Sequence, residues 1–91
     1  MNKKDAHDVL EKYVTPLIQC EFSQLAMLAE SKHTDLMEAA GPSGVRYQIE
    51  IQYFWDHRPG GAVRVLASID DGGFFTSILP LTQSWLIEPS G

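Results

Sequence analysis

Residues 45–55 alternate between apolar and polar side chains with a period of two. The apolar set is Val45, Tyr47, Ile49, Ile51, Tyr53 and Trp55, and Arg46, Gln48, Glu50 and Gln52 lie between its members. Because successive side chains of a β-strand point to opposite faces, one face of this strand is predicted to be buried and the other solvated. The segment therefore predicts an antiparallel sheet with one open face, against which the later strands can be registered.

The turn at 57–61, which contains Pro59-Gly60-Gly61, is predicted to return the chain into a second strand at 62–70. With this loop the facing pairs are Trp55 with Val63, Tyr53 with Val65, Ile51 with Ala67, and Ile49 with Ile69. All four pairs are apolar, whereas a slip of one residue would bury Arg64 and Ser68. The pattern therefore specifies one register.

The dipeptide Asp71-Gly72 is a strong two-residue hairpin signal and predicts a third strand over 74–81. That hairpin would place Ile69 opposite Phe74 and Val65 opposite Ile78. Residues 82–88 are expected to form either a short fourth strand or an irregular tail over the sheet.

The first third of the chain has the spacing of an amphipathic helix. Apolar residues return every three or four positions: Val9, Leu10, Tyr13, Val14, Leu17, Ile18, Phe22, Leu25, Ala26 and Ala29. Pro16 interrupts the pattern, either as the first residue of a second helix after Thr15 or as a kink. Because the apolar stripe keeps its phase across Pro16, we expect one kinked or closely jointed helix over residues 5–31.

After this helix, Asp35 to Ala40 are expected to form one or two helical turns, and Gly41-Pro42-Ser43-Gly44 ends regular structure. The helical stripe and the apolar sheet face can bury each other. The predicted fold is therefore a two-layer α+β domain, with an N-terminal helix kinked near Pro16 on one face of a three- or four-stranded antiparallel meander. We expect residues 1–91 to form one domain, helical over 5–40 and sheet over 45–88.

Composition excludes several classes of function. The net charge is −5 and neither half is basic, so we expect no nucleic-acid partner. A single cysteine, Cys20, gives no disulfide framework, and it is expected to be a packing residue rather than a nucleophile. No apolar run suits a signal peptide or a membrane span, which predicts a cytoplasmic protein. No His, Cys, Asp and Glu grouping has ligand spacing, so neither a metal nor a cofactor is expected.

Two regions are candidate binding sites. On the second sheet face we expect an apolar patch, which indicates an interface with a protein partner or with a second copy in a homodimer; its residues are Phe54, Leu66, Phe75, Leu79 and Leu81. Alternatively, Trp85, Leu86 and Ile87 would fold back and cover this patch.

The second candidate is the turn Asp56-His57-Arg58, where a histidine beside a carboxylate could act as a general base or bind a ligand. The acidic turn Asp70-Asp71 should lie at the other end of the second strand, too far away to share this site. The leading functional hypothesis is a small acidic, non-enzymatic protein-interaction module of the inhibitor, immunity or adaptor type. The alternative is a small enzyme or ligand-binding domain with its site near Asp56, His57 and Arg58.

Overall fold

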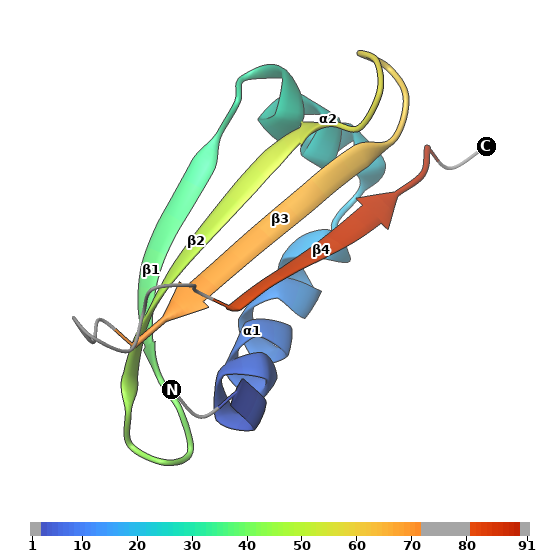
Figure 1. The fold of residues 1–91 in the computed structure, drawn as a ribbon. Helices are drawn as coiled ribbons and strands as arrows, with labels where there is room; N and C mark the ends of the chain where they lie inside the picture. Colours follow the sequence, from blue (N-terminus) through green and yellow to red (C-terminus); the bar gives the residue numbers. More distant parts are fainter. Residues whose placement is uncertain (1–2, 72–80, 90–91) are drawn as a thin grey trace.

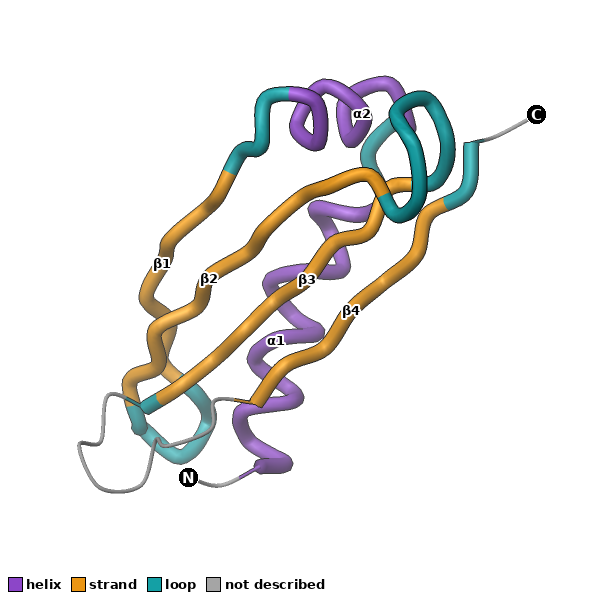
Figure 2. Tube along the Cα trace, turned by 45° about the horizontal axis from the view of Figure 1, so that its top comes forward, coloured by secondary structure: helices purple, strands orange, loops and turns teal. Residues whose placement is uncertain are grey.

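The computed structural model describes residues 3–71 and 81–89, which form two helices and a four-stranded antiparallel sheet (Figure 1). The elements are α1 (Lys3–Ile18), α2 (Phe22–Glu30), β1 (Thr34–Ala40), β2 (Arg46–Trp55), β3 (Val63–Asp70) and β4 (Leu81–Ile87). The strands follow one another in the order β1-β2-β3-β4, as in a meander. Both helices lie on the same side of the sheet, and Figure 2 shows α1 beneath β3 and β4. The predicted two-layer α+β class is confirmed.

The predicted register of β2 against β3 is also confirmed. Ile49 faces Ile69, Ile51 faces Ala67, Tyr53 faces Val65 and Trp55 faces Val63. The four β3 partners are completely buried, because a period-two pattern with one apolar face has only one register that hides that face.

The first strand of the sheet was not anticipated. Thr34–Ala40 pairs with β2 through seven facing residues, so the expected helical turns at Asp35 to Ala40 are wrong. Five of its seven residues are good helix formers, namely Leu36, Met37, Glu38, Ala39 and Ala40. Pairing with the exposed edge of β2 overrides this weak local preference, as tertiary context commonly does.

The last strand lies later in the chain than expected. Ile69 faces Leu81 and Val65 faces Trp85, so the predicted partners Phe74 and Ile78 are wrong. This pairing brings Leu81, Trp85 and Ile87 against the core, and cross-strand pairs of aromatic and β-branched residues stabilise a sheet. Gly72, Phe74 and Ile78 themselves lie outside the described residues.

The expected helix over 5–31 is a closely jointed pair rather than one kinked helix. α1 continues through Pro16 and ends at Ile18, and α2 begins at Phe22. Proline removes a backbone donor from the last turn of α1, which weakens that turn without stopping it at once. At the joint the half-buried Cys20 thiol donates a hydrogen bond to the Leu17 carbonyl over 3.0 Å, a contact in keeping with its expected packing role.

The core lies between the sheet and the two helices. α1 packs on β3 and β4, α2 packs mainly on β2, and β1 is held chiefly by β2. The buried apolar residues are Ala6, Val9, Leu10, Val14, Leu25, Ala29, Ala39, Tyr47, Ile49, Ile51, Tyr53, Val63, Val65, Ala67 and Ile69. The opposite face of the sheet carries no described helix, which leaves it as the main candidate surface.

Candidate functional site

The face of the sheet opposite the helices, called here the open face, mixes polar residues with a few exposed apolar ones. Among the latter, Leu36 is 75% exposed, Leu86 is 45% exposed and Phe54 is 37% exposed. Alternation along the strands and the register define the face. Its members are Thr34, Leu36, Glu38, Ala40, Arg46, Gln48, Glu50, Gln52, Phe54, Arg64, Leu66, Ser68, Asp70, Thr82, Ser84 and Leu86.

The structure brings together only part of the predicted interface. Phe54 faces Arg64, and Leu66 lies on the next rung between Gln52 and Ser84. Leu81 faces Ile69 and packs partly buried against the core. It was placed on the open face because the third strand was expected at 74–81; with β4 beginning at Leu81 it belongs to the helix side. Phe75 and Leu79 lie outside the described residues.

The segment that was expected as a possible cover is instead the edge strand β4. Trp85 and Ile87 point to the helix side, where they pack against the core. Leu86 points to the open face opposite Arg64. At one end of the open face, Arg64 is therefore surrounded by Phe54, Leu66 and Leu86. We call these three apolar residues the apolar patch.

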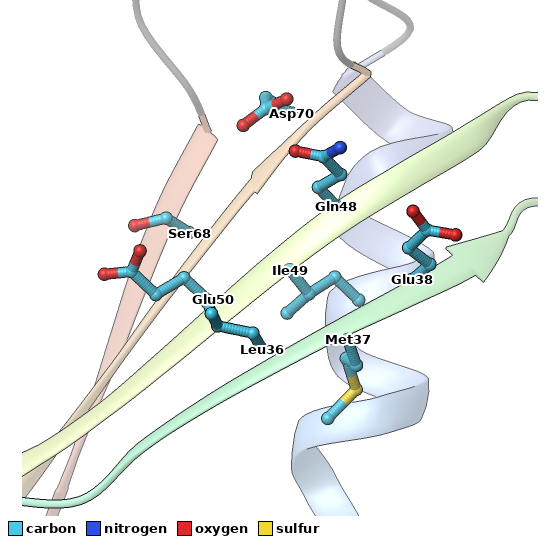
Figure 3. A pocket seen from close by; sticks show the side chains of 8 residues that line it. All are labelled: Leu36, Met37, Glu38, Gln48, Ile49, Glu50, Ser68 and Asp70. Carbon is cyan, nitrogen blue, oxygen red and sulfur yellow. The ribbon is translucent and has the colours of Figure 1, made fainter.

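A hollow of about 560 Å³ occupies the other end of the open face, over β1, β2 and β3. Figure 3 shows carboxylates of Glu38, Glu50 and Asp70 projecting from three strands, with α1 behind the sheet. The lining residues are Leu36, Met37, Glu38, Gln48, Ile49, Glu50, Ser68 and Asp70. We call this site the acidic hollow.

Local contacts hold two of these carboxylates in place. Arg46 Nη2 donates to Glu38 Oε2 over 3.1 Å, and Gln52 Nε2 donates to Glu50 Oε1 over 2.8 Å. The sequence reasoning missed the acidic hollow because it treated residues 35–40 as helical. Residues 35–38 read Asp-Leu-Met-Glu, so polar and apolar residues do not alternate and no period-two signal marks this strand.

The candidate at Asp56-His57-Arg58 lies in the β2–β3 loop. Asp56 Oδ1 accepts a hydrogen bond from Arg64 Nε over 2.7 Å, and His57 Nε2 lies 3.2 Å from Asp56 Oδ2. The His57 side chain is 92% exposed, whereas that of Asp56 is 15% exposed. A hollow of about 340 Å³ adjoins this loop and the end of β4. The main partner of Asp56 is thus Arg64, which anchors the loop to the sheet. Asp70 lies at the far end of β3, as expected.

Two tyrosine–aspartate pairs, which sequence reasoning also missed, connect β2 to its surroundings. Tyr47 Oη and Ser43 Oγ each donate to Asp5 Oδ2 over 2.7 Å. The hydrogen bond from Tyr47, followed by that from Ser43, lowers the pKa of Asp5. Burial, followed by the same bond to Asp5, raises the pKa of Tyr47 to about 12.

The second pair lies at the other end of β2. Tyr53 Oη donates to Asp35 Oδ2 over 2.8 Å, and His33 Nε2 lies 2.7 Å from Asp35 Oδ1. Burial raises the pKa of Tyr53, and the bond to Asp35 adds to the effect. Because every one of these polar groups is satisfied within the fold, the two pairs attach α1 and β1, respectively, to β2.

These pairs predict how stability depends on pH. The folded pKa of Asp5 is lowered, so its contribution should be complete above its usual pKa of 3.8 and be lost as pH falls below that value. The folded pKa of Tyr47 is raised, so its contribution should be complete below pH 10 and be lost as pH rises from 10 towards about 12. Asp5→Asn should make the acid side of the curve shallower, and Tyr47→Phe should make the alkaline side shallower, where Tyr53 still contributes. Urea midpoints measured across pH test both. Profiles parallel to that of the wild type would contradict both assignments.

Comparison with protein-family models, with curated proteins and with solved structures gives no significant match for this chain. Among residues 3–71 and 81–89, no three His, Cys, Asp or Glu side chains are grouped so that they could hold a metal ion. In the same part of the chain, neither helix has the length and apolar character needed to cross a bilayer.

Proposed function

We propose that this chain is a small, non-enzymatic protein-interaction module that binds a protein through the open face of its sheet. The observation that carries the proposal is the open face itself, where Phe54 and Leu86 are exposed, whereas α1 and α2 cover the other side of β2, β3 and β4. Apolar side chains grouped on a surface and surrounded by polar ones are characteristic of interfaces.

The surroundings of the apolar patch fit this role. Arg64 lies between Phe54 and Leu86, with its guanidinium held by Asp56 and by Ser84 Oγ, to which Nη1 donates over 3.1 Å. An arginine held in one orientation beside an aromatic ring loses little side-chain entropy on binding. Aromatic residues and arginine are also the types that most often dominate binding energy.

A ligand-binding or catalytic site at Asp56-His57-Arg58 is the second candidate, favoured by the 340 Å³ hollow and by the 3.2 Å contact between Asp56 and His57. General-base catalysis, however, needs a histidine that is fixed in position next to its substrate. The His57 side chain projects into solvent, and Asp56 is engaged by Arg64. The open face is therefore the better supported site.

Leu66→Glu should weaken binding, because it places a carboxylate within the apolar patch. The expected loss is about 2 kcal/mol or more, roughly thirty-fold in affinity. Sedimentation over a concentration series tests a homodimer, and affinity capture from the native host tests a different protein partner.

Met27→Glu is the matched control, since Met27 is 72% exposed but lies on α2, away from the open face. It should bind like the wild type. His57→Ala separates the two candidate functions, because it should leave protein binding unchanged. A wild type that stays monomeric and captures the same proteins as Leu66→Glu would overturn the proposal.

A further inference from the structure

We propose that the outer edge of β1 accepts an extended, basic segment of the partner protein as a fifth strand of the sheet. This inference rests on the proposed function and specifies how the partner binds and what its chemistry is. Addition of a strand to a sheet edge gives affinity through backbone hydrogen bonds and specificity through alternate side chains.

Backbone hydrogen bonds define which groups of β1 point outward. The Gly41 amide donates to the Val45 carbonyl over 2.9 Å, and the Asp56 amide donates to the Ala62 carbonyl over 2.9 Å. In antiparallel pairing successive residues alternate between the two neighbouring sides. Odd-numbered residues of β1 therefore bond to β2, and the N–H and C=O groups of Thr34, Leu36, Glu38 and Ala40 point away from the sheet.

Apart from its two acidic residues, Asp35 and Glu38, the β1 edge lacks the features that usually protect an edge strand. Its seven residues contain no proline and no lysine, and their register with β2 has no bulge. Both views place β1 as the strand farthest from α1 (Figures 1 and 2). β4, at the opposite edge, packs against α1. Among residues 3–71 and 81–89, the outer side of β1 is thus the more accessible of the two edges.

The negative charge beside β1 indicates which kind of segment would bind at this edge. The acidic hollow, which borders β1 on the open face, gathers the carboxylates of Glu38, Glu50 and Asp70, and Arg46 already pairs with Glu38. A strand added beside β1 would place alternate side chains of its own next to Leu36 and Glu38. Lysine or arginine at these positions of the added strand would complement the negative charge of the acidic hollow. Their aliphatic stems could also cover Leu36, which is 75% exposed.

The same charges disfavour a second copy of this chain at the edge. Antiparallel pairing of two β1 strands about Met37 would place Glu38 of each copy on the same face, on adjacent rungs. Each Glu50 would lie one strand further in, on the rung of Leu36. Like charges at such positions destabilise a sheet, and each copy also carries a net charge of −5. The favoured occupant is a basic strand from another protein.

The test uses the peptide acetyl-KVKVKVK-amide, whose lysines would face the open side and whose valines would lie beside Met37 on the other side. NMR should show binding, together with slowed hydrogen exchange at the outward amides of Leu36 and Glu38 but not at those of Thr82 and Ser84. A peptide of the same sequence, N-methylated at alternate residues to block pairing, should lose affinity by roughly ten-fold or more. The peptide acetyl-EVEVEVE-amide should not bind.

Two variants examine the edge and the charge separately. Leu36→Pro removes an outward N–H, which an edge strand tolerates, and Leu36→Val is its control because it keeps that N–H. Glu50→Lys should weaken the lysine peptide by roughly ten-fold while leaving the edge intact. If Leu36→Pro does not fold, the N-methylated peptide still decides the question.

Equal binding of the plain and N-methylated peptides, or protection at β4 instead of β1, would overturn the β1 edge as the site. Equal binding of the lysine and glutamate peptides would overturn the basic partner. These failures are distinct from failure of the proposed function, which is read from Leu66→Glu at the other end of the open face.

Discussion

Ile51→Ala is expected to lower the free energy of unfolding by about 2–5 kcal/mol, the usual range for a large buried aliphatic side chain. Ile51 is completely buried and lies at the centre of β2, between Asp35 of β1 and Ala67 of β3. Since it points into the layer between sheet and helices, its truncation leaves a cavity that rigid neighbouring strands cannot close. The loss would be a large part of the stability of a small domain.

The measurement is the urea midpoint and slope of Ile51→Ala compared with Glu50→Ala. Glu50 is the adjacent residue on the same strand, but its side chain points to the open face and is exposed. Its replacement should change the free energy by roughly 0.5 kcal/mol or less. Similar midpoints for the two variants would contradict the assignment of faces on β2.

Gly41→Ala is expected to cost about 1–3 kcal/mol, because it overfills a tightly packed site. A Cβ at Gly41 would overlap Oδ2 of Asp5 and lie 2.9 Å from Cε2 of Tyr47. Neither neighbour can move away easily, because Tyr47 and Ser43 both hydrogen-bond to that carboxylate oxygen. The requirement for glycine here is therefore one of space rather than of backbone conformation.

Gly44→Ala provides the comparison, since Gly44 has a φ of 87° and nothing within 4 Å of a built Cβ. Its cost should be backbone strain of about 1–2 kcal/mol. In an Asp5→Ala background the cost of Gly41→Ala should shrink, whereas that of Gly44→Ala should stay the same. An undiminished cost at Gly41 would mean that the contact with Asp5 does not limit the site.

The candidate sites could be read from the sequence only where local pattern and long-range pairing agree. Phe54 and Leu66 were placed on the open face because the β2–β3 register follows from a period-two pattern and a short loop. Leu81 was misplaced because the tight turn at Asp71-Gly72 was taken to set the next strand, whereas Leu81 faces Ile69. The acidic hollow was missed entirely, since it needs β1 beside β2 to bring Glu38 near Glu50.

The sequence by itself determined the two-layer α+β class and the buried face of β2, because burial of alternate apolar residues requires no knowledge of distant partners. Only the tertiary structure decided that Thr34–Ala40 is a strand, that β4 begins at Leu81 and that Tyr47 bonds to Asp5. Each of these depends on free energy gained between different segments of the chain, from the neighbouring strands β1 and β2 to the distant residues Asp5 and Tyr47. Local propensities, which differ by less than about 1 kcal/mol per residue, cannot outweigh such pairing.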